Sequence, residues 1–278
     1  MRRDLLSVSL ALFALSFGTA MARDAAAVEV DVELVLAVDV SWSMDRDEQQ
    51  LQRDGYVAAL RDETVQDAIL NGPNGRVAIT YVEWAGQLSQ SVVIPWTLID
   101  SKEAADGFAY RLSVEEADRE RRTSISSAID FVVPMFENNG FEGMRQVIDV
   151  SGDGPNNQGR TVTEARDAAT ARGITINGLP LMTAGEGSGG FWGSIPDLDA
   201  YYRDCVIGGP GAFMIPVNGW DQFPAAVRRK LIMELAGGWP LKTDDGTAPI
   251  LPVAGQRSAD CLIGETMWRQ RQDRWGPN

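Results

Sequence analysis

A carboxylate and two hydroxyls follow an aliphatic stretch near the start of the chain. The run at residues 34–38 is typical of a strand buried on both faces of a parallel sheet. Asp39, Ser41 and Ser43 lie at alternate positions after it. Side chains two residues apart point to the same side of an extended chain, so these oxygens can share one ligand. An all-oxygen set suits Mg²⁺, Mn²⁺ or Ca²⁺ better than zinc or copper. The turn is therefore predicted to supply part of a metal coordination shell.

Two further residues with oxygen-bearing side chains lie at the ends of predicted elements later in the chain. An octahedral ion needs more ligands than one turn offers. Thr123 stands at the head of an apparent helix, and Asp153 follows another aliphatic strand. Together with Asp39, Ser41 and Ser43, these residues are the predicted metal ligands.

These three pieces, in this order, resemble the von Willebrand factor type A (vWA) family. The family's metal-ion-dependent adhesion site uses D-x-S-x-S, a distant Thr and a distant Asp before Gly, matched by residues 39–43, Thr123 and Asp153. The resemblance covers about residues 31–237. It implies that the two aspartates bind the ion largely through water and the hydroxyls bind it directly or nearly so. It also implies that an Asp or Glu carboxylate of a protein partner completes the shell.

Other polar residues near these positions have two interpretations each. Asp149 interrupts the strand at 145–151 and is either a second-shell partner of the metal hydroxyls or a structural hydrogen-bond acceptor. Arg121 and Arg122 precede Thr123 in a charged stretch that is either a solvated loop or a ligand-binding rim. The family usually has Gly where this chain has Arg122.

A glycine-rich segment at residues 182–196 carries two aromatic side chains. Phe191 and Trp192 are either part of a flexible loop or part of a rim that contacts the partner. Because this segment follows a strand, we expect it on the same face of the sheet as the metal ligands.

Strand and helix patterns alternate along most of the chain. This alternation predicts an α/β fold with a doubly wound, mostly parallel sheet and helices on both faces. The strands at 76–85 and 91–99 are joined by a tight turn, so one edge strand should be antiparallel. In such sheets, ligands bind at the carboxyl ends of the strands, where the predicted metal ligands stand. Helices are expected at 45–70, either continuous or broken near Gly55, and at 101–112, 123–136 and 161–172.

Composition excludes several classes of function. The 278 residues are 44% hydrophobic, enough for one substantial core. A formal net charge of −14 disfavours nucleic acid as a partner. The sequence has no histidine, which excludes His-dependent triads and His-ligated zinc.

The amino terminus has the pattern of a secretory leader. Residues 1–22 combine a basic start, an apolar run and an Ala-Met-Ala end, which predicts a cleaved signal peptide and a periplasmic or extracellular protein without a membrane anchor. A mature amino-terminal segment at 23–30, a vWA-like domain at 31–237 and a packed tail at 238–278 should follow. In an exported chain, Cys205 and Cys261 are predicted to pair, the alternative being two separate thiols.

Two other functions compete with a binding module. One is a metal-dependent hydrolase in which Asp39 and the ion activate water. Against it, Ser41 stands where aspartyl-phosphate hydrolases have a second Asp, and the chain has no P-loop. The other is a scaffold that keeps the fold and binds no metal.

Overall fold

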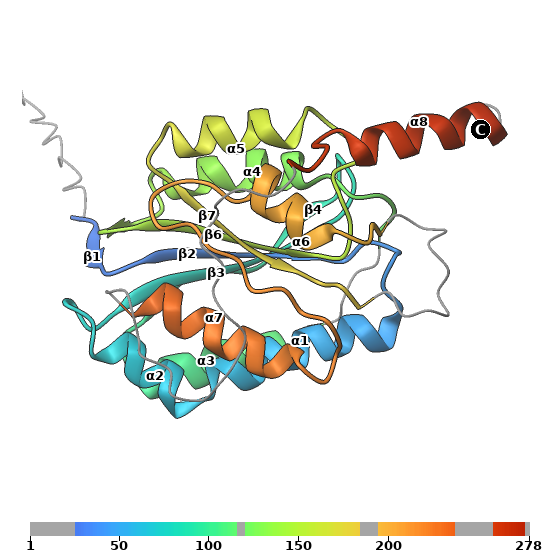
Figure 1. Ribbon diagram of the computed structural model, residues 1–278. Helices are drawn as coiled ribbons and strands as arrows, with labels where there is room; N and C mark the ends of the chain where they lie inside the picture. The colour runs from blue at the N-terminus through green and yellow to red at the C-terminus, as the bar shows by residue number, and fades with distance from the viewer. Residues whose placement is uncertain (1–25, 116–119, 184–193, 237–257, 276–278) are drawn as a thin grey trace, which may run out of the picture.

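A central β-sheet lies between two layers of helices (Figure 1). The computed structural model describes residues 26–115, 120–183, 194–236 and 258–275. The sheet has the strand order β4-β3-β2-β6-β7, with β2 (Glu33–Asp39), β3 (Val77–Trp84), β4 (Gln90–Ile99), β6 (Gln146–Gly152) and β7 (Thr175–Pro180). Only the β3–β4 pair among these is antiparallel, which confirms the predicted fold class. A separate parallel pair joins β1 (Val28–Val30) to β5 (Phe141–Gly143).

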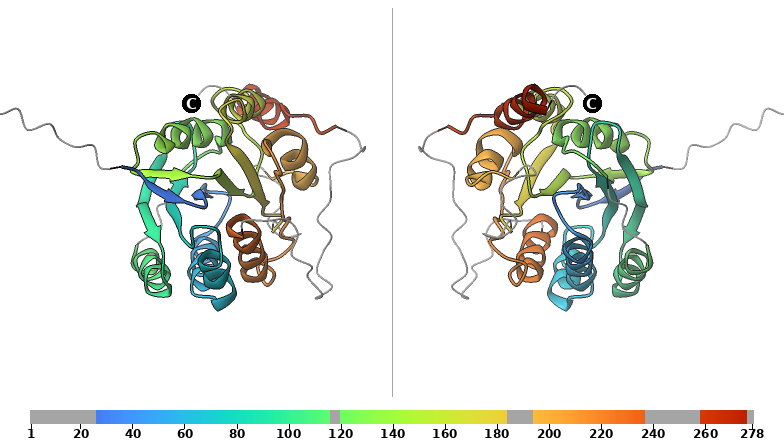
Figure 2. Two further views of the ribbon diagram at one scale, coloured as in Figure 1. Left: turned by 90° about the vertical axis from the view of Figure 1, so that its left-hand side faces the viewer. Right: turned by 90° about the vertical axis from the view of Figure 1, so that its right-hand side faces the viewer.

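The helices divide between the two faces of the sheet, as the end-on views in Figure 2 show. One layer holds α1 (Arg46–Leu60), α2 (Glu63–Leu70), α3 (Lys102–Val114) and α7 (Phe223–Leu235). The other holds α4 (Ile125–Val132), α5 (Val162–Thr170) and α6 (Leu198–Tyr201), and α8 (Ile263–Trp275) lies on the same side (Figure 1). A 3₁₀ turn (Val133–Phe136) extends α4, and a π-helical turn (Tyr202–Val206) extends α6.

The helix expected at residues 45–70 is two helices. The break lies at residues 61–62, where the Asp62 side chain accepts a hydrogen bond from the Thr64 backbone and caps α2. Gly55, the expected place for a break, lies inside α1. A Cβ atom there would be 2.4 Å from the Phe223 ring of α7, so this glycine permits close packing of the two helices.

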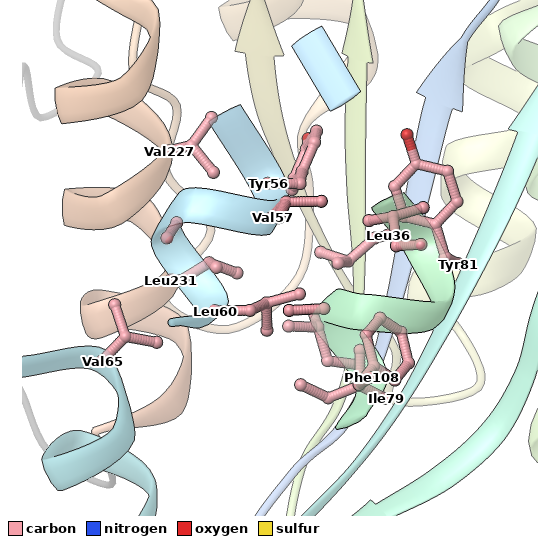
Figure 3. Packing of buried hydrophobic residues seen from close by; sticks show 14 of the residues in the cluster. Leu36, Tyr56, Val57, Leu60, Val65, Ile79, Tyr81, Phe108, Val227 and Leu231 are labelled. Carbon is pink, nitrogen blue, oxygen red and sulfur yellow. The ribbon is translucent and has the colours of Figure 1, made fainter. Parts of the chain in front are cut away.

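The core on the α1 face joins strands and helices distant in sequence (Figure 3). Leu36 of β2 and Ile79 of β3 pack against Tyr56 and Leu60 of α1 and Leu231 of α7, all fully buried. β2 is buried along its whole length because it lies in the middle of the sheet. Its continuous aliphatic pattern is typical of such a strand.

Strand order determines which carboxyl ends meet. The chain passes from β2 to β3 on one side, whereas β6 lies on the other side of β2. Ligands in doubly wound sheets bind at such a reversal point. Asp39 ends β2 and Asp153 follows β6, so both stand there.

The C-terminal helix is covalently attached to the domain. Cys205 in the π-helical turn forms a disulfide with Cys261, which confirms the predicted pairing. Within the described ranges, every helix is too short or too polar to cross a membrane. The predicted leader lies outside the described residues.

Candidate metal-binding site

Four of the five predicted metal ligands form a continuous hydrogen-bonded chain. Asp39 Oδ1 accepts a 2.7 Å hydrogen bond from the Ser41 backbone nitrogen. The hydroxyl oxygens of Ser41 and Ser43 are 2.7 Å apart, and the Ser43 hydroxyl donates to Asp153 Oδ1 at 2.7 Å. The bonds connect the loop after β2, which carries Ser41 and Ser43, to the loop after the neighbouring strand β6, which carries Asp153.

Thr123 reaches the same end of the sheet through its neighbours. Its backbone nitrogen donates to Asn157 Oδ1 at 3.2 Å, and its carbonyl accepts from the Asn157 nitrogen at 2.9 Å. Three residues earlier, the Glu120 nitrogen donates to the Val40 carbonyl at 3.1 Å. The Thr123 loop thus contacts the two loops that carry Asp39 and Asp153.

Two glutamines of α1 hold the end of β2 in place. Gln52 Nε2 donates to the Asp39 carbonyl at 2.9 Å, and Gln49 Nε2 donates to the Val40 carbonyl at 3.0 Å. Both side chains are buried. The sequence analysis did not assign a role to Gln49 or Gln52. Their positions on the core-facing side of a predicted helix, where apolar residues are usual, could have drawn attention to them.

The two aspartates are unfavourably placed as isolated charges. Asp39 is fully buried and Asp153 is 6% exposed. Burial, and then repulsion from Asp153, raise the pKa of Asp39 well above its usual range. Burial raises the pKa of Asp153 to about 6. A nearby cation would offset both effects.

A tyrosine that sequence reasoning missed borders Asp39. A Cβ atom at Gly152 would lie 2.9 Å from Asp39 Oδ2 and 3.0 Å from the Tyr202 hydroxyl, so both groups face this glycine. Among the described residues, neither Asp39 Oδ2 nor the Tyr202 hydroxyl has a hydrogen-bond partner. Buried polar atoms without partners are rare, and a cation or water is the usual explanation. In the sequence, the pair of adjacent tyrosines at 201 and 202 was the only feature that could have drawn attention to Tyr202.

The residues fit a hard divalent cation. They offer carboxylate and hydroxyl oxygens, which Mg²⁺ and Ca²⁺ prefer, and one buried carboxylate oxygen is unpartnered. In the described part of the chain, this site included, Cys, Asp and Glu form no group of three or more arranged to hold a metal, so serine and threonine hydroxyls would have to complete the shell here.

Family and structure comparisons agree with this architecture. The profile of a family described as "Protein of unknown function (DUF1194)" matches residues 29–239. The chain belongs to the DUF1194 family. No curated protein matches this DUF1194 chain.

Solved structures show which fold the DUF1194 chain has. Proximal thread matrix protein 1 (PTMP1) from the mussel byssus is similar with a TM-score of 0.53 and 15% identity, over 76% of this chain and 50% of PTMP1. A PTMP1 structure described with a zinc-occupied MIDAS motif has a TM-score of 0.51 and 16% identity, over 76% and 50%. A von Willebrand factor type A protein from Catenulispora acidiphila has a TM-score of 0.50 and 13% identity, over 74% and 43%. The predicted vWA fold is therefore confirmed, and the DUF1194 chain spans about half the length of PTMP1.

Two arginines border the site and stack on tryptophans. The Arg121 guanidinium lies 4.3 Å from the ring centre of Trp42, and that of Arg122 lies 3.9 Å from the ring centre of Trp268 in α8. Arg122 has a φ of 77°, a left-handed conformation that favours glycine. The other predicted rim residues, Phe191 and Trp192, lie outside the described residues.

Helix α8 of the DUF1194 chain also contacts the Asp153 loop. Asn156 Nδ2 donates to Glu265 Oε1 at 2.7 Å, and the Asn156 nitrogen donates to the Tyr201 hydroxyl at 3.2 Å. A Cβ atom at Gly264 would be 2.0 Å from the Asn156 carbonyl oxygen, so the helix lies directly on this loop.

Asp149 lies apart from the hydroxyl chain. Its Oδ1 atom is 2.8 Å from Lys230 Nζ, and both side chains are 1% exposed. Within the described residues, no hydrogen bond joins Asp149 to Ser41 or Ser43. Of its two interpretations, the structure places it with a structural partner, a lysine from α7.

Proposed function

We propose that this chain is an exported, metal-dependent binding module that captures an acidic group of a protein partner. Asp39, Ser41, Ser43, Thr123 and Asp153 would hold Mg²⁺, with Mn²⁺ or Ca²⁺ as alternatives. The observation that carries the proposal is the hydrogen-bonded chain from Asp39 to Asp153, with the buried Asp39 Oδ2 left unpartnered.

The residues present define the chemistry of capture. Two carboxylates balance the charge of a divalent ion at most, and neutral hydroxyls add no charge, so five protein ligands leave one position of an octahedral shell for a further oxygen. An Asp or Glu carboxylate from a partner supplies an oxygen ligand that such an ion prefers. Arg121 and Arg122, exposed beside Thr123, add positive charge that favours an acidic partner. The disulfide supports export, because such bonds persist in oxidising compartments.

Calorimetric titration of chelator-stripped protein tests the metal site. We expect the parent chain to bind Mg²⁺ or Mn²⁺ and the Asp39→Asn variant to bind neither, because it loses a charged ligand. The matched control is Asp67→Asn, which removes an exposed carboxylate that pairs with Lys102 on the surface and should retain parental binding. A folded parent that binds none of Mg²⁺, Mn²⁺ and Ca²⁺ would instead indicate a metal-free scaffold.

The capture step needs a separate measurement. Immobilised parent chain, Asp39→Asn and parent with EDTA are compared for binding to proteins of an envelope extract. We expect the same partner to be lost in the variant and with EDTA, and an added Glu-containing peptide from that partner to compete. Phosphoester hydrolysis that requires Mg²⁺ and disappears in Asp39→Asn would assign the hydrolase alternative.

A further inference from the structure

A buried lysine lies against two carboxyl groups that are not among the predicted metal ligands. Lys230 and Glu234 occupy successive turns of α7, and their side chains are in contact. Asp149 of β6 lies directly opposite Asn177 of β7 in the sheet. Lys230 Nζ is 2.8 Å from Asp149 Oδ1, and Asn177 Nδ2 donates to Glu234 Oε1 at 2.9 Å.

The surroundings of this lysine shield it from bulk solvent. Lys230 and Glu234 are fully buried, Asp149 is 1% exposed, and the Phe213 ring centre lies 5.0 Å from Nζ. Asn177 Oδ1 accepts a 3.0 Å hydrogen bond from the Phe213 nitrogen, which fixes the ring relative to the cluster. Charged groups in such a place carry a large desolvation cost, even when they are paired.

The charges of the cluster do not balance. Lys230, Asp149 and Glu234 carry one ammonium against two carboxylates, so these three groups have a net negative charge when all are ionised. The Arg145 guanidinium lies beside them and donates to the Glu234 backbone carbonyl at 2.7 Å. Burial, and then the charge of Asp149, raise the pKa of Glu234 to about 7, and burial also raises the pKa of Asp149. Glu234 Oε2 has no hydrogen-bond partner within the described residues, which leaves it available to carry a proton.

We propose that Lys230 and Asp149 become joined by an intramolecular amide bond, with Glu234 as the proton carrier. A buried amine beside a carboxyl group, with a second carboxyl group in contact with the amine, is the set of groups that this condensation needs. The product replaces two buried charges with one neutral amide, which removes their desolvation cost.

The reaction requires no external reactant. A proton passes from the Lys230 ammonium to the Asp149 carboxylate, leaving a neutral amine and a carboxylic acid. The Nζ lone pair then attacks Asp149 Cγ, a C–N bond forms, and the C–OH bond breaks. Glu234 accepts the proton that the amine loses and donates it to the departing hydroxyl, which leaves as water. Nothing is oxidised or reduced, and Glu234 returns to its starting state.

The same chemistry is not available to the exposed lysine pair. Lys102 Nζ is 3.2 Å from Asp67 Oδ1, but these side chains are 44% and 56% exposed. Water stabilises both charges there, and no second carboxyl group is buried beside the amine. The Lys102–Asp67 pair is therefore an internal control, because it should form no amide bond in the same molecule.

The bond would connect two elements that frame the site. β6 carries Asp149 and leads directly to Asp153, and α7 packs against α1 through Phe223 and Gly55. A covalent link from β6 to α7 would hold this side of the sheet together independently of the disulfide. The amide bond does not depend on metal binding, so a negative result for one proposal does not contradict the other.

Mass spectrometry of the folded, purified chain tests the bond. After reduction of the disulfide, we expect the intact mass to be lower than the sequence mass by one water molecule. Trypsin should yield residues 146–160 joined to residues 230–242, with no cleavage after Lys230. Peptides that contain Lys102 or Asp67 should be unmodified. An unshifted intact mass with separate peptides from these two regions would overturn the proposal.

Two variants identify the roles of the groups. Lys230→Met removes the amine and should show the full sequence mass, whereas Lys102→Met should keep the water loss. Glu234→Gln keeps both reacting groups but removes the proton carrier, so we expect at least partial loss of the cross-link. A full cross-link in folded Glu234→Gln would remove Glu234 from the mechanism. Because the first measurement uses the parent chain, poor folding of a variant cannot hide a negative result.

Discussion

At the scale of single residues, the candidate site depends on carboxyl groups that the fold buries. Asp39 and Asp153 are both buried, and the hydroxyls of Ser41 and Ser43 connect them through hydrogen bonds. Arg122, next to Thr123, has a left-handed backbone conformation that costs about 1 kcal/mol in conformational free energy, and its guanidinium stacks on Trp268. Carboxylates are seldom buried, and arginine seldom has a positive φ, so the intrinsic preferences of these residues do not explain their positions.

Glu234 gives stability a measurable pH dependence. Its pKa is raised from 4.5 to about 7, so between these values the folded chain keeps a proton that the unfolded chain has lost. Its stabilising contribution is therefore complete below pH 4.5 and declines as pH rises towards 7, with a slope of at most about 1.4 kcal/mol per pH unit. We expect Glu234→Gln to flatten this slope in urea unfolding at pH 5 and 7, whereas Glu63→Gln, which removes an exposed carboxylate, keeps it. Parallel curves for the parent and Glu234→Gln would contradict the assignment.

At the scale of elements, α1 has two structural tasks. Gln49 and Gln52 on its buried side hold the backbone at the end of β2. One turn further on, Gly55 allows the Phe223 ring of α7 to approach the helix backbone. The position of the candidate site thus depends on how closely α1 and α7 pack.

Two helix glycines provide a matched test of this packing. Gly55→Ala would place Cβ 2.4 Å from the Phe223 ring, and we expect it to destabilise the chain by about 1–3 kcal/mol despite the higher helix propensity of alanine. Gly107→Ala in α3 meets no atom within 4 Å and should stabilise the chain by about 0.5–1 kcal/mol. Denaturant unfolding measures both. Stabilisation by both substitutions would show that the α1–α7 approach is looser than described.

At the scale of the whole molecule, the C-terminal helix is part of the site's surroundings. The disulfide attaches it beside α6, and Glu265 and Trp268 contact the Asp153 and Thr123 loops. This helix lies beyond residues 29–239, the range matched to the DUF1194 family. It therefore adds contacts outside the region that defines the family.

Removal of the disulfide should lower stability substantially. The bond spans 56 residues, and in the chain-entropy picture closing such a loop contributes about 4 kcal/mol. We expect Cys261→Ser to lose stability of this order in urea unfolding. Reduced parent chain should match the variant, and the variant should be insensitive to reductant. A variant as stable as the oxidised parent would show that noncovalent contacts alone hold α8.

Local patterns were sufficient for much of the fold. The aliphatic run before Asp39 predicted a central buried strand, and the short link between residues 85 and 91 predicted an antiparallel edge. The helix break was placed wrongly, because a glycine inside a helix was interpreted without its packing partner. The capping aspartate at position 62 was the stronger signal.

The sequence by itself determined which oxygens could act together within one turn. Asp39, Ser41 and Ser43 share a side because backbone geometry sets the alternation of neighbouring side chains. The sequence proposed Asp153 as a further ligand, but only the tertiary structure decided that this residue, 110 residues from Ser43, meets the same chain of hydroxyls, and that Asp149 meets Lys230 instead. These contacts depend on strand order and on the path of α7. Both are set by the packing of distant parts of the chain, which leaves no mark in local residue patterns.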